Sequence, residues 1–412
     1  MTEASDVSKT RLILALTALF LSSMCTLGDL VINPIAANLY EVFADQPEWL
    51  INLGITGPAL VGLPFGLLAG FLCDRMDKKN VMVIGFAIFT VSACLGGAVV
   101  NIYYFVSLRL CATGIGWGIT NTAALAILAD LFTDETEHGK YVGRYNAVMS
   151  IMGAIMAAVS GMFAVNGWQH AFSTYLISIP ILIMLVVFLP KFPPHEVKTA
   201  DTADADEEEI VQKGWAKKLI PLTIQVFFVA VCYFVLLYMN GLFVTDAGAG
   251  DESFIGLLAS AGTLATAVGS LVFGRVYAKM KSAVYLPALF IMGICLLVMA
   301  MAPVAAVIMA CVIIAGFFWP FYFCYFYTRA TELVPASKAG TATSIVALSD
   351  GLAATACSYA LTGFMGAFNT TSVAVWPIFG VTLLVVGVIS CIWFAASNKK
   401  NKSASDSDSA SA

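Results

Sequence analysis

Charged residues are scarce in this chain. Only 11% of its 412 residues are Asp, Glu, Lys or Arg, whereas 60% are hydrophobic and the mean hydropathy is +0.88. A soluble domain carries about 25% charged residues. A chain with so few cannot cover a water-facing surface with polar groups, which excludes an ordinary soluble globular protein.

Sequence motifs of catalysis and cofactor binding are also missing. The chain has no Walker motif, no nucleotide-binding domain and no Ser/His/Asp combination. The ten cysteines fall in or at the ends of apolar segments, and none is spaced like a metal ligand. We therefore predict that the protein is not an enzyme and binds neither a cofactor nor a metal. The cysteines are interpreted as small, polarizable packing residues.

Long apolar segments, in contrast, occur from end to end. About 20 apolar residues in a helix cross about 30 Å of hydrocarbon. Twelve such segments predict an all-α integral membrane protein with twelve transmembrane helices. They cover approximately residues 11–40, 48–72, 80–99, 102–131, 141–164, 168–190, 217–245, 252–275, 283–302, 304–331, 340–364 and 372–396.

Basic residues fall on one side of this predicted topology. Nineteen of the 21 Lys and Arg lie in segments that are cytoplasmic if the N-terminus is inside, and Arg109 and Arg329 lie within predicted helices. The predicted external loops contain acids such as Asp246 and Glu252 but no Lys or Arg. The positive-inside rule therefore predicts a multi-pass protein of the plasma (cytoplasmic) membrane with both termini in the cytoplasm.

A short charged loop between the second and third segments occurs twice. Residues 70–79 read G-x-x-x-D-R-x-x-K-K, and Gly274 and Lys279 repeat Gly70 and Arg75 after 204 residues. This repeat predicts a tandem duplication into two pseudo-symmetric six-helix halves. The predicted divisions are a half at 1–190, a cytoplasmic linker at 191–216, a half at 217–398 and a disordered tail at 399–412.

This loop resembles the one between helices 2 and 3 of the major facilitator superfamily, and the resemblance covers nearly the whole chain. It implies a conformational latch on the cytoplasmic side, in which Asp74 faces the start of helix 11 near Gly340 and Arg75 pairs with Asp130. The alternative is that the basic residues only set the topology. The complete predicted latch is Gly70, Asp74, Arg75, Lys78, Lys79 and Asp130.

Asp29 is a carboxylate inside the first apolar segment, followed by Asn33 and Pro34. A charge at membrane depth costs about 2.5–3.5 kcal/mol, so Asp29 should face a cavity or a partner. Proton-coupled members of the superfamily carry a similar Asp before a Pro in their first helix, and this resemblance implies proton coupling. The alternative is a structural hydrogen bond to a neighbouring helix.

Arg109 lies inside the fourth segment, about 10 Å from its external end, and Asp29 lies at a comparable depth of about 16 Å. We therefore expect the two side chains to pair, either in transport or as a salt bridge that only stabilises. The superfamily often has R-x-x-x-G here, whereas in this chain Gly114 follows Arg109 by five residues. Thr113 lies on the same predicted helix face as Arg109.

Asp350 lies in the eleventh segment, ten residues and about 15 Å from Gly340, close to the membrane midplane. Arg329 is the one basic residue of the second half that could reach it. An unpaired acid at this depth binds a cation, titrates, or stays protonated by burial. Together with Asp29 and Arg109 it forms the predicted proton-coupling and substrate site.

Polar and aromatic residues at helical spacing predict a substrate cavity around these charges. The tenth segment is rich in aromatic residues, which either contact an organic substrate or only pack against other helices. The predicted cavity residues are Asn33, Thr113, Asn146, Tyr233, Asn240, Phe318, Tyr322 and Tyr325.

These features predict a secondary active transporter that moves a small organic solute by alternating access of two halves and is coupled to protons. Two alternatives are an organic-anion carrier or exchanger that binds a carboxylate through Arg109, and a transporter-like receptor that moves no solute. The predicted partners are a small-molecule substrate, protons and membrane lipid. We expect no nucleic acid and a monomer.

Overall fold

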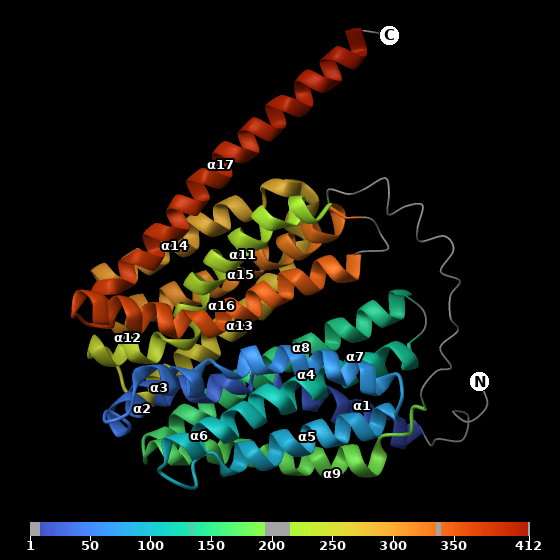
Figure 1. Cartoon of the computed structure of the whole chain (residues 1–412), viewed down its shortest axis with the longest axis vertical. Coiled ribbons are helices and arrows are strands. Elements are labelled where there is room, and N and C mark those ends of the chain that lie inside the picture. The colour runs from blue at the N-terminus through green and yellow to red at the C-terminus, as the bar shows by residue number, and fades with distance from the viewer. Residues whose placement is uncertain (1–8, 133–134, 194–214, 335–338, 411–412) are drawn as a thin grey trace.

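The computed structural model describes residues 9–132, 135–193, 215–334 and 339–410, and the regular elements in these ranges are all helical. The helices form two lobes, with α1 to α9 in the N-terminal lobe and α11 to α17 in the C-terminal lobe (Figure 1). The elements of the N-terminal lobe are α1 (Lys9–Leu21), η2 (Ser22–Cys25), η3 (Gly28–Ile35), α2 (Ala36–Val42), α3 (Glu48–Ile55), α4 (Pro58–Cys73), α5 (Lys78–Leu95), α6 (Ile102–Arg109), η4 (Leu110–Gly116), α7 (Trp117–Leu131), α8 (Glu135–Ala164), η5 (Trp168–Ile177) and α9 (Ser178–Phe188).

The C-terminal lobe repeats this order. Its α16 begins and ends 204 residues after α8, and its α13 begins 204 residues after α3. The same offset separates the two charged loops, so the repeat extends from the loops to the helices. The elements of this lobe are α11 (Trp215–Tyr238), α12 (Asn240–Asp246), α13 (Glu252–Met280), η6 (Lys281–Ala283), α14 (Tyr285–Met301), α15 (Ala305–Glu332), α16 (Ala339–Phe368) and α17 (Ser372–Ala410).

Twelve membrane segments are present in the described residues. Ten are apolar and long enough to cross a membrane, and an eleventh is the pair α3 and α4, bent by 47°. The helix breaks there because Pro58 cannot donate a backbone hydrogen bond. The twelfth, α14, has 17 residues, which is within the range that spans a bilayer. The predicted fold class is therefore confirmed.

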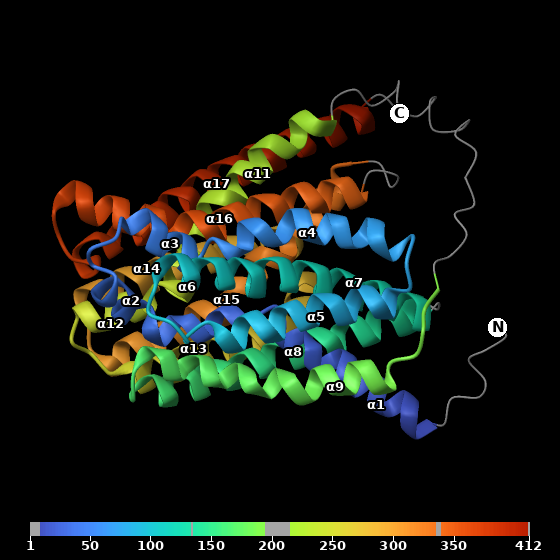
Figure 2. The same ribbon diagram turned by 60° about the horizontal axis from the view of Figure 1, so that its bottom comes forward.

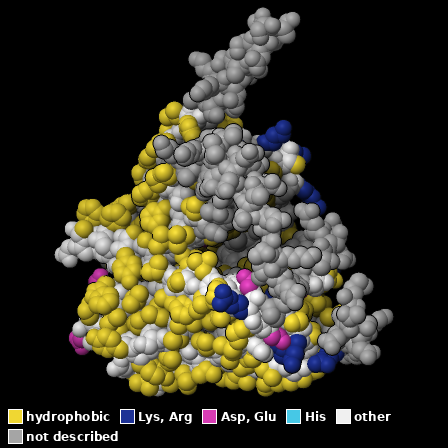
Figure 3. Space-filling model, turned by 45° about the vertical axis from the view of Figure 1, so that its right-hand side comes forward, with side chains coloured by type: hydrophobic (Ala, Val, Ile, Leu, Met, Phe, Trp, Pro, Cys, Tyr) yellow, Lys and Arg dark blue, Asp and Glu magenta, His cyan; other side chains and the backbone are white. Residues whose placement is uncertain are grey.

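The outer surface of the helices is apolar, as lipid contact requires. Leu67, Leu271 and Met301 are 76%, 77% and 84% exposed. Figure 3 shows hydrophobic side chains over most of the visible face, with Lys and Arg gathered at the end that comes forward and a hollow beside them.

The two ends of the helix bundle differ in charge. We call the end at which α4 finishes and α5 starts, with Arg75 and Lys78, the basic end. The opposite end, where α12 finishes and α13 starts, carries Asp246 and Glu252 and is called the acidic end. Figure 2 shows that the start of α1 and the finish of α17 both lie at the basic end.

The first membrane segment is broken where it crosses the interior. Ser22 and Ser23 donate hydrogen bonds to the carbonyls of Leu19 and Phe20, at 2.6 and 2.5 Å. Pro34 then lies inside η3. These residues divide the predicted helix 11–40 into α1, η2, η3 and α2. The seventh segment is broken in the same way, between α11 and α12.

The helix α17 continues to Ala410, into the stretch whose composition predicts disorder. Residues 395–410 contain no Pro or Gly, so no residue there interrupts helical hydrogen bonding. Most of the predicted linker, residues 194–214, lies outside the described residues.

Candidate functional site

The predicted pair of Asp29 and Arg109 is present in the N-terminal lobe. Arg109 donates from Nη2 to Asp29 Oδ1 at 2.5 Å and from Nε to the carbonyl of Gly54 at 3.1 Å. The Arg109 side chain is 2% exposed and that of Asp29 is 15% exposed. The carboxylate is therefore the more accessible member of a buried ion pair.

The broken first segment positions Asp29. The Tyr175 hydroxyl of η5 donates to the Gly28 carbonyl at 2.7 Å, which fixes η3 beside Arg109. Asn33, one turn beyond Asp29, donates from Nδ2 to the Leu237 carbonyl of the other lobe at 2.6 Å. Gly241 is needed at this crossing because a Cβ there would lie 2.2 Å from the Asn33 carbonyl oxygen. The broken first and seventh segments thus meet at the centre.

The helix around Arg109 is locally wider than an α-helix. Leu110–Gly116 is a π-helix between α6 and α7, and Thr113 within it donates to the Arg109 carbonyl at 3.3 Å. A π turn accommodates one additional residue in a helix and is frequent at functional sites. This accounts for the five-residue spacing between Arg109 and Gly114, which departs from the R-x-x-x-G of the superfamily.

Asp350 lies on α16 in the C-terminal lobe, and its surroundings differ from those of Asp29. Its Oδ1 is buried and has no hydrogen-bond partner among the residues that the structure describes. Arg329, the expected cationic neighbour, instead pairs with Glu332 at 2.8 Å, and both side chains are exposed. Among the residues described, none forms an ion pair with Asp350.

Four tyrosines lie near this carboxylate. Tyr233 and Tyr238 of α11 and Tyr322 and Tyr327 of α15 all lie within electrostatic range of Asp350. Tyr238 is also within range of Asp29, so it lies near the charged centres of both lobes. Sequence analysis missed Tyr238 and Tyr327, although Tyr238 follows Tyr233 on the same helix.

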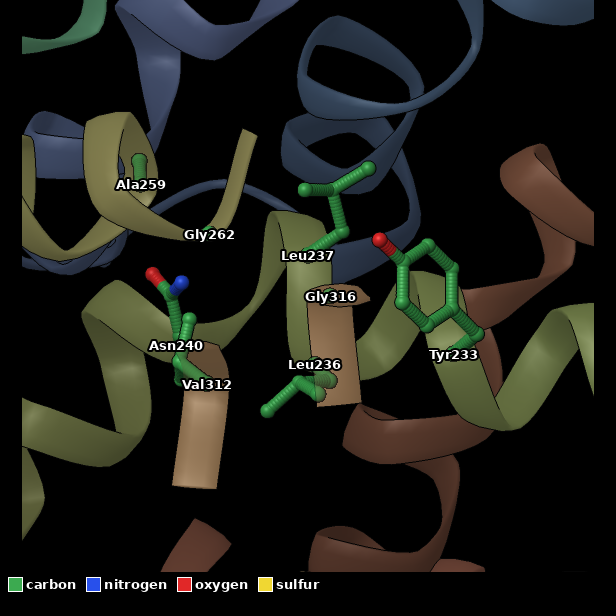
Figure 4. A pocket seen from close by; sticks show the side chains of 8 residues that line it. All are labelled: Tyr233, Leu236, Leu237, Asn240, Ala259, Gly262, Val312 and Gly316. Carbon is green, nitrogen blue, oxygen red and sulfur yellow. The ribbon is translucent and has the colours of Figure 1, made fainter. Parts of the chain in front are cut away.

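A small cavity lies beside the break in the seventh segment (Figure 4). Its volume of about 10 Å³ is close to the minimum for one water molecule. Asn240, at the start of α12, is 1% exposed, and neither its Oδ1 nor its Nδ2 has a hydrogen-bond partner. Figure 4 shows its amide and the Tyr233 hydroxyl at the lining. Asn240 and Tyr233 therefore contribute polar groups at separate points of a mostly apolar lining.

Two predicted cavity residues make ring contacts within the C-terminal lobe. Tyr325 stacks on Tyr285 of α14, with ring centroids 4.6 Å apart, inside its own lobe. Phe318 packs edge-on against Phe317 at 5.2 Å. A third predicted cavity residue, Asn146 on α8, is exposed, and the repeat offset of 204 makes it the counterpart of Asp350. The aromatic face that meets Asp350 instead contains Tyr322 and Tyr327.

A set of polar contacts closes the acidic end between the lobes. Thr56 shares a hydrogen bond with Ser358 at 2.6 Å and donates to the Thr355 carbonyl at 3.0 Å. Asn52 donates to Thr362 Oγ1 at 2.9 Å. We call these five residues the acidic-end contacts. Sequence analysis did not identify them, because neutral polar residues are not conspicuous in apolar helices.

Hydrogen bonds between the lobes are confined to one side of the centre. Asn38 donates to Glu252 at 3.2 Å, and Tyr359 donates to the Trp49 carbonyl at 3.2 Å. Within the described ranges, no hydrogen bond joins the lobes between Asn33 and the basic end. The lobes are thus fastened together at the acidic end.

The predicted latch residues lie at the basic end with a different pairing. We expected Arg75 to pair with Asp130, but Lys78 forms the ion pair with Asp130, at 2.5 Å. Lys78 opens α5, which packs beside α7 and therefore beside Asp130. Arg75 lies on the exposed turn after α4, with its guanidinium 4.0 Å from the centre of the Phe71 ring.

The remaining latch residues show that this contact is open. Asp74 is exposed, and its carboxylate has no hydrogen bond or ion pair within the described part of the chain. Lys79 donates its backbone N–H to Asp77 Oδ1 at 2.9 Å. A Cβ on Gly70 would meet only a Thr122 methyl, at 4.0 Å. The helix packing at Gly70 therefore does not require glycine there.

Metal binding has no evident site in the described ranges, because no three His, Cys, Asp or Glu side chains lie close enough together to hold an ion. The chemistry that the centre offers is therefore that of two carboxylates, one guanidinium and several phenols. These groups bind charges and exchange protons.

Comparison with known proteins identifies the family. The sequence model of the Major Facilitator Superfamily matches residues 14–250 and 222–411. The methylenomycin A resistance protein of Bacillus subtilis is 28% identical over 162 residues, which are 38% of this chain and 33% of that protein. The multidrug resistance protein MdtL of Vibrio parahaemolyticus is 26% identical over 208 residues, 48% of this chain and 52% of that protein. The alignments thus span about a third to a half of these relatives.

Solved structures have the same fold over nearly the whole length. The D-xylose-proton symporter has a TM-score of 0.73 at 16% identity, covering 92% of this chain and 96% of that one. A bacterial homolog of the human lysosomal transporter Spinster, in an inward-facing and unoccupied conformation, has a TM-score of 0.70 at 15% identity, covering 93% and 96%. These relatives and structural neighbours are membrane transporters rather than enzymes. This chain is a multi-pass membrane protein that belongs to the Major Facilitator Superfamily.

Proposed function

We propose that this protein is a secondary active transporter that moves a small organic solute by alternating access and couples the movement to protons. The observation that carries the proposal is the pair of carboxylates at the centre of the bundle, Asp29 against Arg109 and Asp350 without a cationic partner. Charged groups inside a membrane are costly and are usually functional.

The contacts between the lobes support alternating access. In the form described here the lobes are fastened at the acidic end by Thr56, Ser358 and their neighbours, while Asp74 at the basic end is exposed. Release of the acidic-end contacts and engagement of the latch would open the centre to the other side. Substrate sites at the interface of two repeats fit this kind of movement.

Proton coupling would use the Asp29 carboxylate, which is the more exposed member of its ion pair with Arg109. Protonation of Asp29 removes its negative charge and therefore weakens its attraction to Arg109. A change in that ion pair alters η3, which contacts the other lobe through Asn33. Proton binding and lobe movement would in this way be linked through the broken first segment.

The distribution of charge supports an orientation for this proposal. We infer that the basic end faces the cytoplasm, because Lys and Arg concentrate on cytoplasmic loops. Both termini would then be cytoplasmic, the membrane would be the plasma membrane, and the unit of transport would be the monomer. The halves would divide at the linker 191–216.

An organic-anion carrier that uses Arg109 is the alternative. Its support is the presence of a buried guanidinium, but Arg109 already donates to Asp29 and to the Gly54 carbonyl. A carboxylate substrate would have to displace the Asp29 carboxylate from this position. The centre has two carboxylates but only one guanidinium among the described residues. This excess of acidic groups favours the proton-coupled transporter over the organic-anion carrier.

The test is solute uptake in proteoliposomes with and without an imposed pH gradient. We expect uptake above the equilibrium level only when the gradient is present, and its collapse when a protonophore is added. Equal uptake with and without the gradient would exclude proton coupling. Ligand binding without flux of any solute would favour a receptor instead.

A further inference from the structure

The Asp350 carboxyl group lies in the membrane interior without a cationic partner among the described residues. Asp29 has Arg109 at 2.5 Å. Arg329 is engaged by Glu332 and exposed, and the side-chain ion pairs of the described residues do not include Asp350. Its Oδ1 is buried and unpaired, and an unpaired ionised carboxylate in the bilayer interior is costly. A ligand that supplies positive charge would remove this cost.

The groups around Asp350 are aromatic rather than basic. Tyr233 stacks face to face on Trp319, with ring centroids 3.9 Å apart and planes 1° apart. Trp319 in turn stacks on Tyr322, at 5.9 Å. The Tyr322 ring is 1% exposed and its hydroxyl has no hydrogen-bond partner. These rings form a continuous aromatic wall, and its Tyr233 and Tyr322 are within electrostatic range of Asp350.

The wall itself is buried, but residues beside it are partly accessible. Asp350 and Gly351 on α16, Tyr238 on α11 and Tyr327 on α15 are all partly exposed. Since the hydrogen bonds between the lobes within the described ranges lie at Asn33 and toward the acidic end, a solute could approach Asp350 from the basic end.

We propose that Asp350 and the surrounding aromatic residues Tyr233, Tyr238, Trp319, Tyr322 and Tyr327 bind an organic cation, with the carboxylate opposite its charge and the rings against its faces. The inference rests on the proposed transport function and names the substrate class for it. Aromatic faces attract cations through their quadrupole, most strongly where water is excluded. The neighbouring carboxylate adds charge attraction that neutral and anionic solutes cannot use.

The test compares matched probes on the purified full chain in lipid nanodiscs. Choline and its neutral isostere 3,3-dimethyl-1-butanol form one pair. Tetraphenylphosphonium and tetraphenylborate, equal in shape and opposite in charge, form the other. Equilibrium dialysis measures binding, and uptake by nanodiscs without protein is subtracted because the tetraphenyl ions partition into lipid. We expect at least one cation to bind at least about tenfold more tightly than its matched probe.

Variants distinguish this site from nonspecific binding. Asp350→Asn should weaken cation binding at least about tenfold, while Asp350→Glu keeps the charge and should retain most of it. Ser349→Ala is the control, because Ser349 is the adjacent residue on α16 but donates to the Thr223 carbonyl at 2.9 Å. It should bind as the unmodified chain does.

Three results would overturn the inference. They are preferential binding of the neutral or anionic probe, cation binding that Asp350→Asn leaves unchanged, and no binding of either cation. Each can coexist with proton-driven uptake of a different solute, which would leave the proposed function intact. Absence of gradient-driven uptake for every solute, with cation binding at Asp350 preserved, would instead reject the transport proposal alone.

Discussion

At the scale of single residues, the two interior carboxylates differ in what neutralises them. Asp29 has a permanent guanidinium beside it, and its charge is balanced in the form described here. Asp350 has tyrosines and an unpaired oxygen. We propose a division of labour, in which Asp29 takes part in coupling through its ion pair with Arg109 and Asp350 binds the solute.

This division predicts different consequences for two similar substitutions. Asp29→Asn should abolish accumulation driven by a pH gradient, yet keep binding of the cationic probe within about twofold, because the tyrosines and Asp350 are untouched. Asp350→Asn should lose both gradient-driven accumulation and binding of the cationic probe. Uptake and equilibrium dialysis on the same preparations measure the two properties. If both variants accumulate solute against its gradient at the unmodified rate, neither acid couples transport.

Stability provides the control for Asp29→Asn. Removing one member of a buried ion pair leaves an uncompensated charge and costs about 3–5 kcal/mol, so the variant should melt earlier. Replacing Arg109 by Met in the same chain should restore part of the melting temperature but not the accumulation. If accumulation returned together with stability, the Asp29 and Arg109 pair would be only structural.

Whether an ion pair could be predicted from the sequence depended on how many oppositely charged residues were possible partners. The pairing of Asp29 and Arg109 was predictable, because two opposite charges at similar membrane depths have few other partners. The partner of Asp130 was not, because Arg75 and Lys78 are three residues apart in one loop. Only the positions of the turn after α4 and the start of α5 decide that Lys78 is the closer one.

At the scale of elements, the acidic-end contacts hold α3 and α4 against α16. Thr56 makes hydrogen bonds to both Ser358 and Thr355. Each buried hydrogen bond contributes about 0.5–1.5 kcal/mol. Thr56→Val keeps the shape and removes these bonds, so it should shift the equilibrium roughly tenfold toward separation at this end.

Spin labels at the exposed positions Glu41 and Asn369 would measure this shift as a longer distance between the lobes. Thr382→Val is the matched control, because Thr382 donates only to the Ile378 carbonyl of its own helix. An unchanged distance distribution in Thr56→Val would show that the acidic-end contacts do not hold the lobes together.

The loop between α4 and α5 leads to a complementary expectation at the basic end. Asp74 is exposed without a partner in the form described here, so Asp74→Asn should neither destabilise this form nor impair membrane insertion. If the carboxylate meets the start of α16 when the basic end closes, attraction to the helix N-terminus contributes about 0.3–1 kcal/mol. Its loss should lower the transport rate about two- to fivefold.

Transport rate and thiol accessibility at the basic end are the measurements for this variant. A chain with Asp74→Asn that transports fully and shows the accessibility pattern of the unmodified protein would contradict the latch.

Element boundaries were predictable only where apolar length determines them. The twelve segments follow from the hydrophobic thickness of a membrane. The broken first segment did not follow, because Ser22, Ser23, Gly28 and Pro34 act through backbone hydrogen bonds that hydropathy does not register. The π-helix after Arg109 left one sequence signal, the extra residue before Gly114.

At the scale of the whole molecule, the duplication determines which residues meet where the two lobes contact each other. Asn33 contacts Leu237, which lies 204 residues later, the same offset that separates Gly70 from Gly274. Corresponding residues of the two repeats thus meet at the centre. The contact between Asn33 and Leu237 can therefore act as a pivot when one lobe moves against the other.

Rigid movement of the lobes predicts the effect of covalent links across the acidic end. Asn38 of the N-terminal lobe donates to Glu252 of the C-terminal lobe at 3.2 Å. With cysteines at both positions and a short bifunctional thiol reagent, the acidic end should be locked and solute accumulation should stop. Cation binding from the basic end should persist, because Asp350 remains accessible there.

The matched control links two positions within one lobe. Ser372 donates its backbone N–H to Asp246 at 2.9 Å, and both residues belong to the C-terminal lobe. Cysteines at 246 and 372, treated with the same reagent, should leave transport near the unlinked rate because this link does not restrain one lobe against the other. Continued turnover in the chain linked between 38 and 252 would mean that the acidic end need not open, and transport by alternating movement of the two lobes would then be rejected.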